Sequence, residues 1–120
     1  PLTAQTKNMV KNEQLLSMKE DAIIINTARG GIINEQDLYE VMLEEHLSGA
    51  GIDVFENEPY DGKLSDIQRC ILTAHMGSMS EDCRARMEVE AAEEAIRFLT
   101  NQPLTAIVPE EEYTVQREGL

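Results

Sequence analysis

The sequence predicts an α/β fold in which a small parallel sheet alternates with helices. Three short apolar runs carry the strand signal, and segments with helical periodicity separate them. The runs are AIIIN at 22–26, GAGIDVF at 49–55 and CILTAH at 70–75. Strands that alternate with helical segments are typical of parallel sheets joined by crossover helices. We therefore expect a partial parallel sheet of about three strands, with crossover helices and one long C-terminal helix.

The first run predicts a strand that is buried on both faces, because its isoleucines follow one another without polar alternation. Nothing in the chain predicts a fourth strand, so one edge of the sheet is expected to be unprotected. Each run leads into polar or ionisable side chains, and ligands bind at the carboxyl ends of parallel strands. These side chains are Asn26, Thr27 and Arg29 after the first run, Asp53, Glu56 and Glu58 after the second, and His75 after the third.

Two shorter helices are expected before the second strand. Asn12 is the predicted cap of the first helix, which carries Leu15, Leu16 and Met18. Asn34 is the predicted start of the second helix, with acidic residues in its first turn and an apolar face behind them. We expect His46 and Gly49 to end that helix, and His46 to do no more than complement the helix dipole.

The longest helix is expected from Ser80 to about Thr100. Ser78 and Glu81 have the spacing of a capping box. An apolar stripe predicts close packing of this helix, and its members are Cys83, Met87, Ala91, Ala95 and Leu99. Beyond it, Pro109 and a run of glutamates predict an extended tail over 101–120.

The composition excludes several classes of partner. The chain has 120 residues, and 10 Lys and Arg against 23 Asp and Glu give a formal net charge of −13. This charge repels nucleic-acid phosphates and anionic membranes. No apolar run approaches the roughly 20 residues of a membrane-spanning helix, so we expect a cytoplasmic protein without nucleic-acid or membrane partners. PLTAQT at 1–6 has the character of a loop interior, which predicts that the chain is a piece of something longer.

Arg29 is the first residue with a predicted chemical role. Gly30 and Gly31 follow it, which lets the backbone turn while the side chain projects over the strand end. A planar guanidinium can bind a carboxylate through two parallel hydrogen bonds. The alternative is that Arg29 only forms a salt bridge with one of the abundant acids.

A second hypothesis concerns His75 and Glu58. A histidine can exchange a proton near neutral pH, although a hydrogen-bonded structural histidine is the alternative. Glu58 precedes a proline on the loop after the neighbouring strand, where it is either a solvated acid or a partner of His75. If the two meet, the carboxylate favours the imidazolium and creates an acid/base pair. Asp53 ends a buried strand, where an unpaired carboxylate is costly, so we expect it to have a dedicated donor.

Other chemistries lack their sequence signatures. The chain contains neither GxGxxG nor GxxxxGK[ST], so no phosphate-binding loop is predicted. The hydrolase elbow is absent, and one candidate histidine argues against a metal site. Cys70 and Cys83 lie in neither a redox nor a zinc-binding spacing, and we interpret them as structural.

Four elements, in this order and spacing, resemble the NAD-dependent D-isomer-specific 2-hydroxyacid dehydrogenases. They are PLTAQT, INTARGGIINEQDL, GAGIDVFENEP and ILTAHMGS, and they cover roughly residues 1–100. The resemblance implies that Arg29 binds the substrate carboxylate, that His75 is the general acid/base and that Glu58 supports it. It also implies NAD as cofactor, with NADP left open. The implied cofactor contacts are Pro1, Leu2, Thr3, Thr27, Ala28, Arg29, Asp53, His75, Gly77 and Ser78, with Asp53 facing the nicotinamide amide.

The same resemblance implies a partial Rossmann-type sheet and an order of domains. Residues 1–79 correspond to the second half of the dinucleotide-binding domain, 80–100 to a long interdomain helix, and 101–120 to a tail that returns towards the substrate domain. The substrate domain and the Gly-rich pyrophosphate loop have no counterpart in this sequence. The complete enzyme is expected to be a homodimer that transfers a hydride between nicotinamide and a small anionic D-2-hydroxyacid or 2-oxoacid.

Three alternatives stay open within this resemblance. The family includes dinucleotide-responsive corepressors, so the chain could serve as a binding module, and a truncated, non-catalytic product is the second alternative. Formate dehydrogenases are less favoured because Glu58 stands where they have glutamine. The sequence departs mildly from many members at Ala74, where proline is frequent, and at 78–80. It does not identify the particular hydroxyacid.

Overall fold

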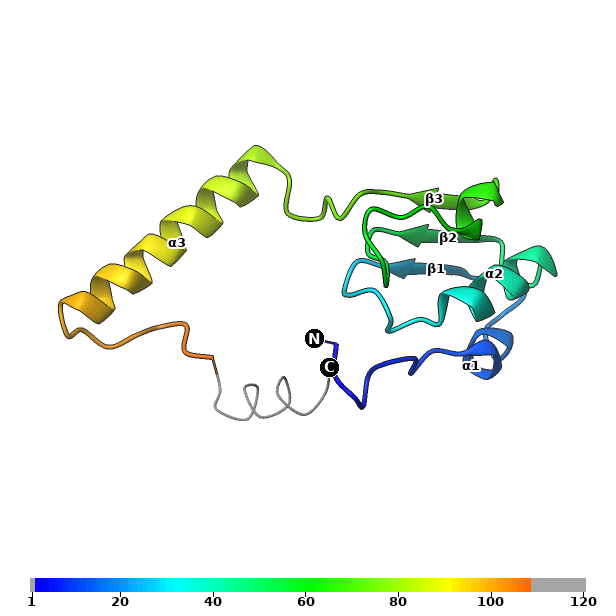
Figure 1. Cartoon of the computed structure of the whole chain (residues 1–120), viewed down its shortest axis with the longest axis horizontal. Coiled ribbons are helices and arrows are strands. Elements are labelled where there is room, and N and C mark those ends of the chain that lie inside the picture. The colour runs from blue at the N-terminus through cyan, green and yellow to red at the C-terminus, as the bar shows by residue number, and fades with distance from the viewer. Residues whose placement is uncertain (1, 109–120) are drawn as a thin grey trace.

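The computed structural model describes residues 2–108, in which a small sheet with two helices lies at one end and a long helix at the other (Figure 1). The helices are α1 (Asn12–Leu16), α2 (Glu35–Leu43) and α3 (Glu81–Leu99), and the strands are β1 (Ile23–Asn26), β2 (Gly49–Ile52) and β3 (Cys70–Leu72). A short 3-10 helix spans Lys63–Asp66. This order confirms the predicted α/β class.

The three strands form one parallel sheet in the order β1-β2-β3. In register, Ile24 lies opposite Ala50, and Ala50 lies opposite Cys70. Helix α2 is the crossover between β1 and β2, as predicted. The connection from β2 to β3 contains the 3-10 helix. The parallel register brings the carboxyl ends of all three strands to one edge.

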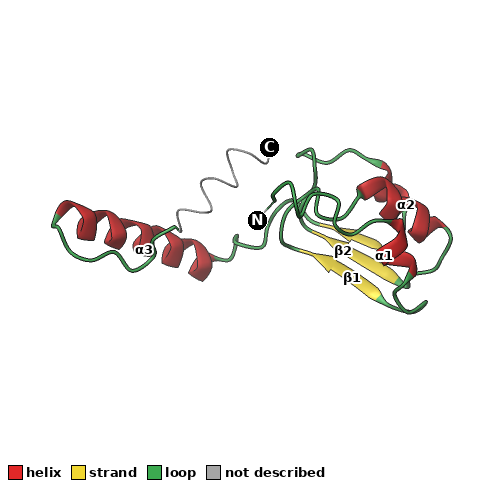
Figure 2. Ribbon diagram, turned by 90° about the horizontal axis from the view of Figure 1, so that it is seen from below, coloured by secondary structure: helices red, strands yellow, loops and turns green. Residues whose placement is uncertain are grey.

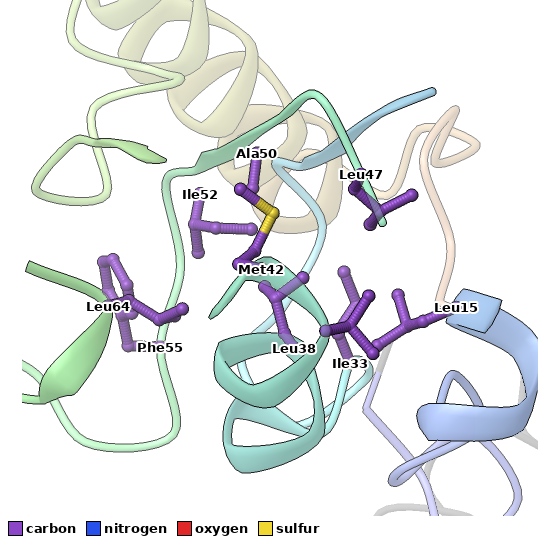
Figure 3. Close-up of a cluster of buried hydrophobic side chains, with 10 residues drawn as sticks. Leu15, Ile33, Leu38, Met42, Leu47, Ala50, Ile52, Phe55 and Leu64 are labelled. Carbon is purple, nitrogen blue, oxygen red and sulfur yellow. The ribbon is translucent and has the colours of Figure 1, made fainter. Parts of the chain in front are cut away.

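The core lies between one face of the sheet and the two helices α1 and α2, which lie on the same side of the strands (Figure 2). Leu38 and Met42 of α2 point towards Ala50 and Ile52 of β2 (Figure 3). The largest fully buried side chains are Leu15, Leu38, Met42, Leu47, Leu64, Val41 and Val54. This core fixes the sheet edge from which the polar loops project.

The opposite face of the sheet is uncovered within residues 2–108. Ile23, Ile25 and Ile71 are 64%, 69% and 73% exposed, respectively. The expectation that the first strand is buried on both faces was therefore wrong for this chain. Both nearby helices pack on the other face, so only alternate residues of β1 reach the core.

Helix α1 differs from the predicted helix at both of its ends. Lys11 is the N-cap of α1, Asn12 is its first helical residue, and the helix ends before Met18. The main-chain N–H of Asn12 donates to Asp37 Oδ2 at 2.9 Å, so its position is set by α2 rather than by capping.

Asn34 caps α2 as predicted, because its Oδ1 accepts the N–H of Asp37 at 2.9 Å. The helix ends at Leu43 rather than at His46, and Glu45 follows with a φ of 61° in the left-handed region that terminates helices. His46 Nε2 lies 3.0 Å from Met18 O. Its role is a tertiary contact, which corrects the expected dipole-only role.

Ser80 is the N-cap of α3, with its Oγ accepting the N–H of Cys83 at 3.3 Å, so the predicted capping box from Ser78 was wrong. No residue of α3 is buried, and the expected close packing of its apolar stripe is not found within the described part of the chain. After α3, Thr105 N–H donates to Glu94 Oε2 at 3.0 Å. The rest of the predicted tail, 109–120, lies outside the described residues. Across 2–108, no helix is both long and apolar enough to cross a bilayer.

Candidate active site

Arg29, Glu58 and His75 line one pocket of about 380 Å³ at the carboxyl edge of the sheet. They come from three separate loops, which follow β1, β2 and β3 in turn. The other residues that line this pocket are Leu2, Lys7, Gly30, Gly31, Phe55 and Glu56. The structure thus brings together the three side chains that the sequence singled out.

Glu58 and His75 are in direct contact. His75 Nδ1 lies 3.0 Å from Glu58 Oε2, and the other carboxylate oxygen, Oε1, accepts the N–H of Phe55 at 3.0 Å. The Phe55 N–H, and after it the imidazole of His75, lower the pKa of Glu58 from its ordinary value of 4.5. Glu58 is therefore ionised near neutral pH and orients Nδ1 of the histidine, leaving Nε2 as the ring atom for a substrate.

Asp53 organises the chain on both sides of His75. Its buried carboxylate accepts the hydroxyl of Thr73 and the N–H groups of Met76 and Gly77, the last two at 2.7 and 2.9 Å. The Thr73 hydroxyl, followed by the Met76 N–H, lowers the pKa of Asp53. The expected dedicated donor is confirmed, and there are three of them. Asp53 O also accepts the N–H of His75 at 2.8 Å, which fixes the left-handed backbone of His75 at φ 53°.

The loop that carries Arg29 is held by Asn26, a buried polar residue at the end of β1. Its Oδ1 accepts the N–H of Ala28, and its Nδ2 donates to Arg29 O, both at 3.1 Å. Arg29 Nη1 donates to Ala28 O at 2.7 Å. Within residues 2–108 Arg29 forms no salt bridge, so the alternative of a purely structural ion pair finds no partner in the described part. Its guanidinium is exposed at the pocket.

The expected cofactor contacts are spread along the same edge. Thr27 and Ala28 follow β1, while Gly77 and Ser78 follow β3. Leu2 lines the pocket, whereas the hydroxyl of Thr3 is engaged inside its own loop, where it accepts the N–H of Gln5 at 3.2 Å. Pro1 lies outside the described residues.

Asp53 has the chemistry to accept a hydrogen bond from an amide group such as that of a nicotinamide. Asp53 Oδ1 accepts two hydrogen bonds, but Oδ2 accepts only the N–H of Gly77, which leaves acceptor capacity for an amide donor. The sequence holds no GxGxxG for the pyrophosphate, so these residues fit only one end of a dinucleotide.

The sequence analysis missed one pocket residue, Lys7, and named another, Glu56, without assigning it a role. Lys7 belongs to a loop far from Arg29 in the sequence, and main-chain hydrogen bonds such as Asn8 N–H to Gly31 O, at 2.6 Å, bring the two loops together. A contact between loops that are far apart in the sequence leaves no periodic pattern by which the sequence could predict it. Glu56 was placed at the strand end by the sequence, but one exposed acid among many carried no sign of a role.

Residues 1–77 match the family described as "D-isomer specific 2-hydroxyacid dehydrogenase, NAD binding domain". The chain belongs to this family. The match to its NAD-binding domain confirms the family that the four sequence elements indicated and the expectation of a nicotinamide dinucleotide as cofactor. It leaves the individual roles of Arg29, Glu58 and His75 as predictions.

Relatives within the dehydrogenase family show how much of a longer fold this chain spans. A glyoxylate reductase of Korarchaeum cryptofilum is 37% identical over 121 residues, covering 99% of this chain and 36% of the relative. A D-3-phosphoglycerate dehydrogenase of Bacillus subtilis is 36% identical over 109 residues, covering 90% of this chain and 21% of the relative. The crystal structure of a glyoxylate reductase from Paecilomyes thermophila superimposes with a TM-score of 0.85 at 31% identity, covering 92% and 34%. The chain spans between about a fifth and little more than a third of the length of these relatives.

Proposed function

We propose that this chain supplies the acid/base and carboxylate-binding residues of an NAD(P)-dependent 2-hydroxyacid dehydrogenase. One observation carries the proposal: the Glu58–His75 pair and the exposed guanidinium of Arg29 line a single pocket. A proton-exchanging group beside a carboxylate-binding group is what interconversion of a 2-hydroxyacid and a 2-oxoacid requires.

In this proposal, Arg29 holds the substrate carboxylate through two parallel hydrogen bonds, which fixes C2 of the substrate beside the histidine. His75 takes the hydroxyl proton on Nε2 during oxidation and returns it during reduction. Glu58 stays ionised throughout, because its Oε1 accepts the Phe55 N–H, and it stabilises the imidazolium when His75 carries the proton. The nicotinamide, when bound, supplies or accepts the hydride.

Asp53 is the residue we assign to the nicotinamide amide, with Thr27, Ala28, Gly77 and Ser78 beside it. NADP stays open alongside NAD. The division of the chain into a cofactor-domain half (1–79), an interdomain helix (80–100) and a returning tail (101–120) is part of the same proposal. A homodimeric complete enzyme and a cytoplasmic location stay predictions from the sequence.

The proposal is tested by NADH oxidation with a panel of small 2-oxoacids, using protein made from the complete reading frame. Turnover is expected, and His75→Gln should reduce kcat by about 100-fold or more. His46→Gln is the matched control, because that histidine contacts Met18 outside the pocket and should leave kcat unchanged.

The same assay separates the alternatives. NADH binding without turnover of any 2-oxoacid would contradict the proposal and favour the dinucleotide-responsive binding module. Neither binding nor turnover would favour the truncated, non-catalytic product. Equal loss of activity in the His75 and His46 variants would show that His75 acts only through folding.

A further inference from the structure

The loop that carries Lys7 is fastened to the loop that carries Arg29. Asn8 N–H donates to Gly31 O at 2.6 Å, and Val10 N–H donates to Ile32 O at 3.1 Å. Lys7 N–H closes a turn on Thr3 O at 2.8 Å. Lys7 therefore has a fixed origin beside the Arg29 loop, and both side chains line the same pocket.

Neither cation is neutralised within residues 2–108. Arg69, Arg86 and Arg97 each form an ion pair with a glutamate, whereas Lys7 and Arg29 have no carboxylate within ion-pair distance in the described part. The chain carries 23 acidic residues against 10 basic ones, so carboxylate partners are abundant. What separates Lys7 from a solvated surface lysine is that it shares a pocket with Arg29 and His75.

We infer that Lys7 binds a second anionic group of the substrate, at the end away from the carboxylate that Arg29 holds. The inference rests on the proposed function, and it names the substrate class: 2-oxoacids and 2-hydroxyacids that carry a further carboxylate or phosphate. An ammonium suits both groups, because it recognises an anion as a point charge. The pocket volume of about 380 Å³ is within the range of small-molecule sites.

Glu56 lines the same pocket and carries the opposite charge to Lys7. Its main-chain N–H donates to Glu35 Oε1 at 2.7 Å, which fixes the backbone from which its side chain enters the pocket. The carboxylate of Glu58 is already paired with His75, whereas Glu56 forms no ion pair within residues 2–108. A second anionic group is therefore attracted by Lys7 and repelled by Glu56, and the two side chains predict opposite effects on selectivity.

The experiment compares kcat/KM for three 2-oxoacids with NADH, using the full-length protein. Pyruvate has no second anionic group, 2-oxoglutarate adds a carboxylate, and 3-phosphonooxypyruvate adds a phosphate. The readout is the ratio of kcat/KM for each doubly charged substrate to that for pyruvate. Lys7→Gln should lower this ratio about tenfold for the group that the site binds, as expected for loss of a charge-assisted contact. Glu56→Gln should raise it about threefold.

Lys19→Gln is the matched control, because it makes the same charge change on an exposed turn outside the pocket and should not alter the ratio. A response with only one doubly charged substrate identifies the group as carboxylate or phosphate. An unchanged ratio for both in Lys7→Gln would overturn the subsite and leave the proposed dehydrogenase intact. Absence of turnover with all three substrates in the parent would overturn both.

Discussion

The main chains of Gly30 and Phe55 lie in direct contact. A Cβ atom added to Gly30 would lie only 1.9 Å from Phe55 O and 2.6 Å from Glu56 N. Gly30 belongs to the loop that carries Arg29, and Phe55 belongs to the loop that leads to Glu58. This contact, the Gly30–Phe55 crossing, therefore sets the distance between Arg29 and the Glu58–His75 pair. No side chain other than hydrogen fits at Gly30 without a shift of backbone.

Gly30→Ala should therefore both destabilise the protein and impair catalysis. Because the clash is with backbone atoms, we expect a loss of about 1–3 kcal/mol in the free energy of unfolding and a fall in kcat/KM. Gly51→Ala is the control, since its Cβ would meet only the side chain of Ile25 at an ordinary 3.6 Å. Denaturant unfolding and steady-state kinetics on both variants check this. Equal effects of the two changes would contradict a special role of the crossing.

Arg29→Lys should weaken use of 2-oxoacids while leaving NADH affinity little changed. A point-charge ammonium cannot replace two parallel hydrogen bonds to a carboxylate, so kcat/KM should fall at least tenfold, or about 1.4 kcal/mol. Arg86→Lys, on the exposed face of α3, is the control for the same chemical change. Kinetics of Arg29→Lys that equal those of the parent would exclude the carboxylate contact.

Because of Asp53, the free energy of unfolding should fall as the pH is lowered. Its pKa is lowered from the ordinary value of 3.8, chiefly by the Thr73 hydroxyl, so the unfolded chain takes up the proton more readily than the folded one. The resulting stabilisation is complete well above 3.8 and is lost as the pH falls through the lowered pKa.

Asp53→Asn removes this contribution, so the free energy of unfolding should be lower than in the parent at neutral pH and should fall less steeply on acidification below about pH 5. Asp21→Asn, on an exposed turn, is the control and should keep the parent's slope. Urea unfolding at a series of pH values provides the measurement. If the free energy of unfolding of the Asp53 variant fell with pH as steeply as that of the parent, the three hydrogen bonds would not stabilise the ionised carboxylate.

The sheet and the helix α2 were predictable because their signals are local. The apolar runs specify strands, and Asn34 caps α2, through interactions among residues that are close in the sequence. The uncovered face with Ile23 and Ile25 was not predictable, since burial depends on what packs against a strand and not on the strand's composition. For the same reason the stripe of α3 predicted packing that is absent within residues 2–108.

Part of the candidate site was predictable, because the types of its residues and their positions at the ends of strands both indicate it. His75, Glu58 and Arg29 each follow a strand, and parallel register brings such residues together. Lys7 required a contact between two loops, and the Gly30–Phe55 crossing required coordinates. A glycine in the sequence indicates that the backbone can turn tightly there, but only the structure shows which backbone segment packs against it.

The pairing of Glu58 with His75 is the centre of this account, and the rates of both reaction directions in Glu58→Gln test it most directly. The amide cannot stabilise the imidazolium as the carboxylate does. The same imidazole gives the proton in reduction and takes it in oxidation, so both directions should slow.

The measurement is kcat/KM at one pH for 2-oxoacid reduction and 2-hydroxyacid oxidation, in the parent, in Glu58→Gln and in Glu20→Gln as an exposed control. We predict that Glu58→Gln alone lowers kcat/KM at least about tenfold in both directions. A Glu58→Gln variant that keeps the parent's kcat/KM in both directions would contradict the account, because it would show that the carboxylate 3.0 Å from Nδ1 does not govern proton transfer at His75.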